Sequence, residues 1–193
     1  CGTALGANIR DYTFFSYRPE EALHISLREK QVILELLDKI NQELQRCIDC
    51  YSQKIISKYI ELLLDYCERF YERQFITRNE ANKQIIGRFN RLLDHHFHTI
   101  QSQSADLPTI EDCAGSLHLS PAYFNDLLEY ETGKSFKEYL QFKRFETAKD
   151  WLINTDKPLN QIAQELGFRN AQYFSRLFKK MTGCPPNDFR MPN

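Results

Sequence analysis

The sequence lacks the features that mark most enzymes and membrane proteins. No stretch approaches the roughly 18 consecutive apolar residues that a membrane-spanning helix needs, and no secretory signal peptide is visible. There is no glycine-rich phosphate loop, and no nucleophile, base and acid stand at a catalytic spacing. We therefore predict no enzyme activity, no cofactor and no membrane partner.

Cysteine is present without a regular pattern. The six cysteines suit a reducing cytoplasm better than a disulfide framework, and this predicts a cytoplasmic protein. Cys47 and Cys50 form a lone C-x-x-C where a helix is predicted to end. Further metal ligands would have to come from Cys67, His95, His96 and His98. Because no second C-x-x-C exists and the histidines lie on a charged helix, ordinary thiols are favoured over a zinc or redox site, and no metal is predicted.

What the chain does contain is a repeat. Residues 109–133 and 158–183 share one apolar skeleton, with Ile110 and Ala114 standing 49 residues before Leu159 and Ala163. From Tyr123 onward the offset is 50, so one residue is added at 169–172. A pattern of two short helices joined by a tight turn, occurring twice, indicates a doubled helix-turn-helix. The alternative is a plain helical bundle, which does not require the same tight turn twice.

Local signals predict each helix of the repeat. Thr109 and Asp112 form a capping box. The turns need a left-handed residue, which Gly167 supplies freely and His118 tolerates. The other predicted helix ends are Ser120 with Pro121, Gly133, Asn160 and Asn170. The buried stripe of the first copy is Tyr123, Phe124, Leu127 and Leu128.

One long helix is predicted between the two copies. Ser135 begins it, it ends before Asp156, and Trp151 belongs to its buried side. About 18 residues at 1.5 Å each span roughly 27 Å, close to the distance of about 34 Å between successive major-groove faces of B-DNA. A rigid connector of this length suits two DNA-reading motifs in adjacent grooves. We call residues 109–133 the first head and residues 158–183 the second head.

Residues 109–190 resemble the DNA-binding domain of the AraC/XylS family of bacterial transcription regulators. The matching segments are residues 119–124, 131–136, 162–163, 166–168, 173–180 and 185–190. The resemblance implies a unit that places two recognition helices in successive major-groove segments of double-stranded DNA. It also implies a β-barrel sensor domain before the helical region, as many members of the family have.

The resemblance assigns the residues that face DNA. The base-contacting residues it implies are Ala122, Asn125 and Asp126 in the first head, and Ala171, Gln172, Ser175 and Arg176 in the second. Arg176 suits guanine, Gln172 and Asn125 suit adenine, and Asp126 would accept from cytosine. The expected phosphate contacts are Lys134, Lys137, Lys179, Lys180 and the capped helix N-termini. The alternative is that these cations form only a solvated face.

Charge separates the two heads. The whole chain is close to neutral, with 25 basic and 26 acidic residues, which is unfavourable for a protein that must neutralise phosphates. The second head carries Arg169, Arg176, Lys179 and Lys180. The first carries Asp126, Glu129 and Glu131, and the family is commonly basic at the first two positions. An alternative function follows, in which the acidic head contacts a protein such as RNA polymerase.

The first 104 residues are predicted to be a separate region. Residues 12–17 look like a short strand with no local partner, and the chain begins at Cys1 rather than methionine. Both observations predict that a β-rich domain precedes this sequence. The polar residues 101–106 then read as a linker to a DNA-binding domain at 105–193.

Two long helices and a third fill the rest of this region, so the expected fold class is all-α. Ser26 and Glu29 form a capping box, a second helix begins at Ser52, and a third begins near Thr77. The first two form an antiparallel hairpin. Its apolar stripe is broader than one partner helix requires, which favours a homodimer through residues 26–71. Packing on the missing sensor domain is the alternative.

Overall fold

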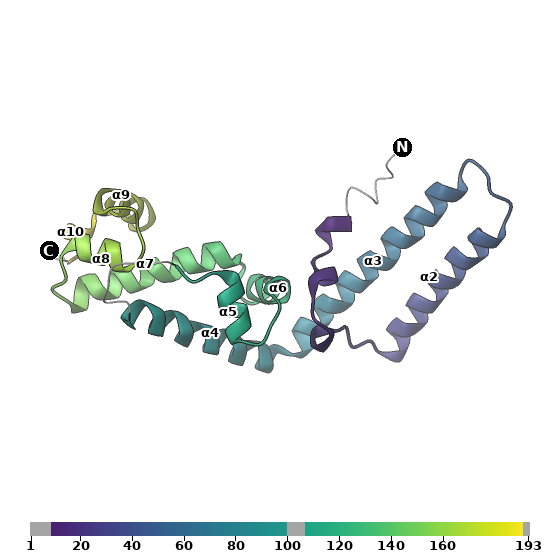
Figure 1. Ribbon diagram of the computed structural model, residues 1–193, viewed down its shortest axis with the longest axis horizontal. Coiled ribbons are helices and arrows are strands. Elements are labelled where there is room, and N and C mark those ends of the chain that lie inside the picture. Colours follow the sequence, from purple (N-terminus) through teal and green to yellow (C-terminus); the bar gives the residue numbers. More distant parts are fainter. Residues whose placement is uncertain (1–8, 100–106, 191–193) are drawn as a thin grey trace. The chain divides into compact units, whose positions relative to one another are not determined.

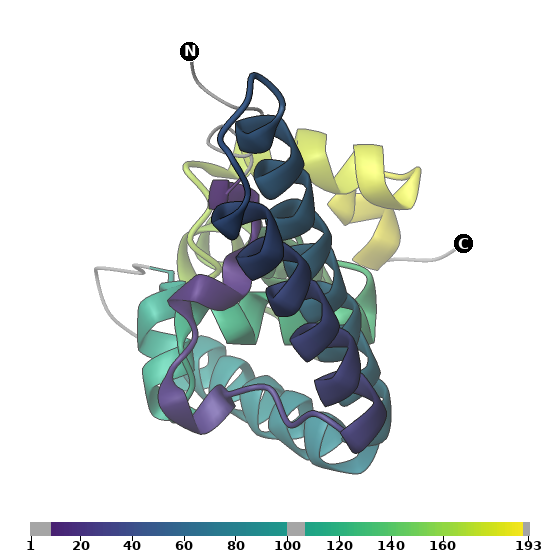
Figure 2. The same ribbon diagram turned by 90° about the vertical axis from the view of Figure 1, so that its right-hand side faces the viewer.

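The computed structural model describes residues 9–99 and 107–190, and every regular element in these ranges is a helix (Figures 1 and 2). The prediction of an all-α fold is therefore confirmed. The predicted linker at 101–106, the chain start at Cys1 and the side chain of His98 lie outside the described residues. Within the described part, no helix is long and apolar enough to cross a membrane.

The chain divides into two compact units, and each is described by itself. The first contains residues 1–83 and 119–127, and the second contains residues 84–118 and 128–193. Helix α6 (Pro121–Thr132) contributes its first seven residues, 121–127, to the first unit.

The first unit is built on a helical hairpin of α2 (Leu27–Gln45) and α3 (Ser52–Thr77), which lie side by side in both views (Figures 1 and 2). The Ser26 hydroxyl accepts a hydrogen bond from the Glu29 backbone N–H, and the Glu29 carboxylate accepts from the Ser26 backbone N–H. This capping box and the start of α3 at Ser52 confirm the predictions. Asp49 supports that start by accepting from the Ser52 N–H.

The prediction of a strand at residues 12–17 is wrong. The segment forms the 3-10 helix η2 (Thr13–Ser16), between η1 (Ile9–Asp11) and η3 (Pro19–Glu21). The rings of Phe14 and Tyr17 both contact Tyr71 of α3, with centroid distances of 5.5 and 5.1 Å. Residues three apart share a face in a 3-10 helix but lie on opposite faces of a strand. Packing against Tyr71 therefore selects the helical form.

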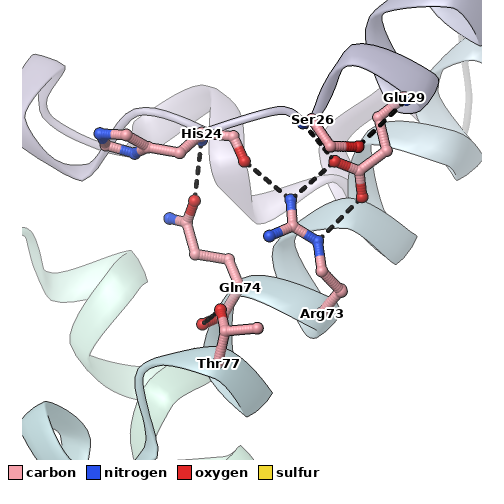
Figure 3. Close-up of polar contacts among 6 residues, drawn as sticks. All are labelled: His24, Ser26, Glu29, Arg73, Gln74 and Thr77. Carbon is pink, nitrogen blue, oxygen red and sulfur yellow. Dashed lines mark hydrogen bonds and ion pairs between the residues drawn. The ribbon is translucent and has the colours of Figure 1, made fainter.

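Helix α3 continues through Thr77, whose hydroxyl donates to the carbonyl of Gln74 at 3.1 Å (Figure 3). Helix α4 (Asn79–Thr99) begins immediately after Arg78, close to the predicted start near Thr77. Thr77 is therefore the last residue of α3, and its hydroxyl bonds within that helix and does not cap α4.

The second unit contains the rest of the repeat. Its helices are α5 (Ile110–Ser116), α7 (Phe136–Asn154), α8 (Leu159–Glu165), α9 (Ala171–Thr182) and α10 (Pro186–Arg190), together with most of α4. Phe145, Phe168, Phe174, Phe178 and Phe189 form a continuous chain of ring contacts. Trp151 is buried, as predicted.

Helix α4 packs with the C-terminal helices. The Phe89 ring lies 5.9 Å from Phe136 and 5.7 Å from Tyr139 of α7. The Tyr139 hydroxyl donates to the Asn90 side chain at 2.8 Å. The third predicted helix therefore shares a core with the double helix-turn-helix, although the sequence associated it with the N-terminal region.

The turn geometry follows the sequence signals. His118, Gly133, Gly167 and Gly183 have φ angles of 60°, 67°, 69° and 86°. Thr109 and Asp112 form the predicted capping box. The prediction that Asn160 caps the first helix of the second copy is wrong, because α8 begins at Leu159. The Pro158 carbonyl already accepts from the N–H groups of Gln161 and Ile162, which leaves Asn160 inside the first turn.

Candidate nucleic-acid interface

The second recognition helix, α9, presents its predicted contact residues on one open face. Gln172 and Arg176 are exposed, Ala171 and Ser175 are half-buried, and the opposite stripe buries Phe174 and Phe178 completely. This separation follows from the helical period, since residues three and four apart share a face. The side chains of this face are available to a partner.

The N-terminus of α9 is capped from within the repeat. The Asn170 side-chain oxygen accepts from the Tyr173 N–H at 2.7 Å, as predicted. The helix carries no acidic residue in its first turn and ends with Lys179 and Lys180. Together with the exposed Arg176, and with Arg169 just before the helix, these lysines make this region cationic, which is the electrostatic character that phosphate contact requires.

A buried arginine fixes the turn of this second motif. Arg144 of α7 donates from Nε to the Leu166 carbonyl at 2.7 Å, and its guanidinium lies 3.8 Å from the centre of the Phe168 ring. Burial lowers the pKa of Arg144 to about 10. The sequence does not single out this residue, because one basic position among several on α7 carries no signal of burial.

The first recognition helix is covered to a much greater extent. Ala122, Asn125 and Asp126 are all half-buried. The Asp126 carboxylate accepts a hydrogen bond from the Tyr17 hydroxyl at 2.6 Å. The pKa of Tyr17 is raised well above its ordinary value, mainly because the ring is buried and secondly because of this bond to Asp126. The sequence predicted no contact between residue 17 and a recognition helix.

The cap of the first recognition helix also has an unpredicted partner. The Ser120 hydroxyl accepts from the Tyr123 N–H, as predicted. Its own proton, however, is donated to the Glu21 carboxylate at 2.6 Å, and the Ser120 backbone N–H donates to the same carboxylate at 2.6 Å. Glu21 and Ser120 are both buried. The N-terminus of α6 therefore faces a carboxylate of the same chain, where a phosphate was expected.

The four predicted phosphate-binding lysines are placed differently. Lys137, Lys179 and Lys180 are exposed. Lys134 is half-buried, and its ammonium lies 5.5 Å from the centre of the Phe142 ring. Such a cation-π contact positions the charge without neutralising it, so Lys134 still offers a positive group.

The thiols and histidines that the structure describes do not gather into a metal-binding or redox centre. In residues 9–99 and 107–190, no three His, Cys, Asp or Glu side chains gather in a metal-binding arrangement. Cys47 and Cys50 are exposed, whereas Cys113 is buried, and burial raises its pKa to about 11. A raised pKa keeps the Cys113 thiol protonated and unreactive at neutral pH.

Comparison with known proteins identifies the C-terminal part. A family model described as "Helix-turn-helix domain" matches residues 113–191. The arabinose operon regulatory protein of Escherichia coli is 35% identical over 135 residues, covering 69% of this chain and 45% of its own length. Residues 113–191 form an AraC-type helix-turn-helix domain. This confirms the resemblance to the AraC/XylS family and supplies a DNA-binding domain of the kind found in transcription regulators.

Two further relatives are transcriptional regulators by name, and one solved structure is also similar. The transcriptional regulator YtdP of Bacillus subtilis is 31% identical over 125 residues, which is 64% of this chain and 16% of the relative. The transcriptional regulator YijO of Escherichia coli is 25% identical over 186 residues, which is 96% of this chain and 62% of the relative. The chain thus spans less than two thirds of the length of these relatives. A solved structure, the C-terminal domain of the response regulator AraT from Geobacillus stearothermophilus, is 34% identical and covers 56% of this chain and 85% of its own, with a TM-score of 0.46.

Proposed function

We propose that this protein is a cytoplasmic, sequence-specific transcription regulator that places α6 and α9 in successive major-groove segments of double-stranded DNA. The observation that carries the proposal is the exposed face of α9, where Gln172 and Arg176 stand beside the half-exposed Ser175. A short exposed face with Arg and Gln, opposite a buried aromatic stripe, is what direct readout of base edges requires.

The roles within α9 follow from side-chain chemistry. Arg176 has a planar fork of donors that matches the O6 and N7 acceptors of guanine, and Gln172 matches the N6 and N7 atoms of adenine. Lys179 and Lys180, in the last turn, reach phosphates and fix the register without reading sequence. In the first head, Ala122, Asn125 and Asp126 occupy the corresponding face.

Helix α7 supports the spacing of the two heads. It has 19 residues, which is about 28 Å at a rise of 1.5 Å per residue. Its capping carboxylate, Glu138, accepts from both the backbone N–H and the hydroxyl of Ser135. A connector anchored in this way at its start is stiff enough to fix the separation of two reading heads.

Selection of binding sites from random duplexes, followed by hydroxyl-radical footprinting, tests the proposal. The whole chain is used at two salt concentrations, because phosphate contacts weaken steeply with salt. Two protected segments about one helical turn apart support two reading heads. Absence of any selected sequence at low salt would exclude sequence-specific binding.

A second function, contact with RNA polymerase through the acidic first head, is favoured by Glu129, which is exposed on α6. Glu129→Lys would abolish such a contact and leave the footprint of α9 unchanged. Binding of purified RNA polymerase to immobilised wild type and variant checks this, and equal binding by both would remove the alternative.

We also propose that the protein forms a homodimer through the hairpin. On α2, Leu27, Leu34 and Asn41 are spaced by seven residues, and Leu37 and Leu44 fall three residues after the last two. All five are exposed, with 87% of the Leu27 surface and 63% of the Leu44 surface open to solvent. The face of α2 that packs in the hairpin is separate and contains the buried Leu36.

This outer stripe supports a second copy as the partner. Apolar residues repeating every seven and every three or four residues form the seam of a coiled coil, and a polar Asn or Lys in the seam, here Asn41 and also Lys30 three residues after Leu27, fixes register between two identical helices. A sensor domain would not require an asparagine at this period.

Sedimentation equilibrium tests the dimer. Leu37→Glu places two charges in the seam and is expected to yield a monomer, whereas Lys39→Glu, two residues away on an exposed position outside the seam, leaves the mass of the dimer unchanged. A wild-type protein that stays monomeric at high micromolar concentration would rule the dimer out and favour packing on another domain.

A further inference from the structure

The N-terminal segment closes over the first recognition helix. The Glu21 carboxylate, 4% exposed, accepts from the backbone N–H and the hydroxyl of Ser120 and from the Arg18 backbone N–H at 2.7 Å. Glu21 thereby occupies the position at which the helix offers its partial positive charge. A helix N-terminus in this position would otherwise be a favourable site for a phosphate.

Aromatic contacts extend this closure along α6. The Tyr17 and Phe75 rings lie 5.1 and 5.3 Å from the Tyr123 ring. The Tyr17 hydroxyl reaches one turn further and holds Asp126. Two residues of the N-terminal segment, Tyr17 and Glu21, therefore bind the cap and the predicted reading face of the same helix.

The segment is itself fixed to the hairpin. The buried Gln74 side chain accepts from the His24 backbone N–H at 2.8 Å, and Arg73 donates to the His24 carbonyl and to both oxygens of Glu29 (Figure 3). These bonds tie residues 24–29 to α3. A displacement of α2 against α3 would therefore pull on Glu21.

The second recognition helix provides an internal comparison. The equivalent residues of the second copy lie fifty positions later: Asn170 corresponds to Ser120, Gln172 to Ala122 and Arg176 to Asp126. Each residue of the second set is exposed, whereas each of the first is buried or half-buried. The repeat unit alone does not produce the cover, because the same architecture leaves α9 open.

We propose that Tyr17 and Glu21 form an autoinhibitory clasp, which withholds the first recognition helix from DNA until the N-terminal segment is released. The inference rests on the proposed function. A buried carboxylate at the N-terminus of α6 repels the DNA phosphate that would bind there, and the Tyr17 hydroxyl bound to Asp126 excludes a base edge from that carboxylate. Clasp closure and DNA contact by the first head are mutually exclusive.

The clasp makes the first head the regulated one. The second head binds DNA in both states, while the first binds only when residues 17–24 leave α6. Any event that strains the hairpin, including association with a second copy, changes the affinity of the first half-site through the bonds of Arg73 and Gln74. Because coupling between two equilibria is reciprocal, binding of DNA at the first half-site must in turn favour the open clasp.

Quantitative footprinting of the selected duplex with the whole chain tests the clasp. Tyr17→Phe removes the bond to Asp126 and keeps the ring. We expect the protein concentration that half-protects the first segment to fall about tenfold, as loss of one hydrogen bond to a charged group would give. Protection of the second segment is expected to be unchanged.

Tyr12→Phe is the matched control. It removes the same hydroxyl from the same segment, but Tyr12 donates to Asp65 of α3 and not to α6. The first segment is expected to respond as in the wild type. An equal gain in both variants would overturn the clasp, because it would reflect general loosening of the segment.

Glu21→Gln supplies a second, independent variant. It keeps an oxygen acceptor for Ser120 and removes the charge that repels phosphate, so the first segment should again gain protection. Unchanged or weaker protection of the first segment in both Tyr17→Phe and Glu21→Gln would show that the segment only braces α6, and would overturn the proposal. Failure of the proposed function looks different, since the second segment would then be unprotected in every variant, wild type included.

Discussion

Tyr123 and Tyr173 hold the same position in the two copies of the repeat, yet Tyr123 is 4% exposed and Tyr173 is 40% exposed. Tyr17 and Phe75 cover the first ring, whereas the second lies open with the Arg176 guanidinium 5.7 Å from its centre. Helices α6 and α9 therefore hold the same place in the repeat, but the side chains that surround them differ.

This difference predicts unequal contributions to stability. Tyr123→Ala should destabilise the protein by about 3 kcal/mol or more, because a large buried aromatic is removed. Tyr173→Ala should cost less, about 1–2 kcal/mol, since a smaller part of its surface is buried. Urea denaturation followed by circular dichroism measures both. Equal losses would mean that the cover over Tyr123 contributes nothing.

Arg176→Ala should weaken binding to the selected site by about 1–3 kcal/mol and relax the preference at one base pair. Lys179→Ala should weaken binding on all sequences alike and reduce the slope of log affinity against log salt by about one. Competition titrations with single-base variants of the site separate the two patterns. A uniform loss for Arg176→Ala would instead identify it as a phosphate contact.

The two turns of the repeat predict opposite responses to exchange of their residues. His118 has a φ of 60°, a conformation that is strained for a residue with a Cβ atom, so His118→Gly should stabilise the protein by up to about 1 kcal/mol. Gly167, at a φ of 69°, should lose about 1–2 kcal/mol on change to Ala. Thermal unfolding of the two variants checks the signs, and a destabilised His118→Gly would point to a contact of the imidazole.

Arg144→Met should destabilise the second helix-turn-helix by about 1–3 kcal/mol, because the Leu166 carbonyl loses its side-chain donor and the Phe168 ring loses the guanidinium above it. Lys143→Met, the same exchange at the half-exposed neighbouring position, serves as the control. Hydrogen exchange of α8 amides is the measurement. Similar protection in both variants would show that Arg144 does not hold the turn.

Acid should loosen the hairpin through Glu29. Burial alone would raise the pKa of Glu29, but hydrogen bonds from Ser26 and the Arg73 guanidinium outweigh it and hold the pKa below its ordinary value of 4.5. A carboxyl whose pKa is lowered by folding contributes stability above pH 4.5, and this contribution is lost as the pH falls through the lowered value.

Thermal unfolding between pH 7 and pH 2 measures this effect. Glu29→Gln should lower the melting temperature at pH 7 and flatten its decline below pH 4.5, whereas Glu72→Gln, at an exposed position of α3, should follow the wild type. Parallel curves for Glu29→Gln and wild type would exclude the role of Glu29.

The sequence by itself determined the local structure of the repeat. A glycine at 133 and 167, a serine before Pro121 and an asparagine at 170 act on backbone groups within a few residues of themselves, so their effect does not depend on the rest of the chain. The exposed face of α9 follows for the same reason, because helical period alone separates Arg176 from Phe174. The failure at Asn160 is also local, since the Pro158 carbonyl had already begun the helix.

Only the tertiary structure decided what covers each element. Residues 12–17 satisfy a strand pattern, and the Tyr71 ring selected a 3-10 helix. Arg144 carries the same charge as the lysines of α7, and only its contacts with Leu166 and Phe168 distinguish it. Glu21 lies 99 residues before Ser120, and no periodicity connects them. Such contacts depend on the path of the chain through space, because a buried charge or ring is stable only where distant backbone groups supply its hydrogen bonds.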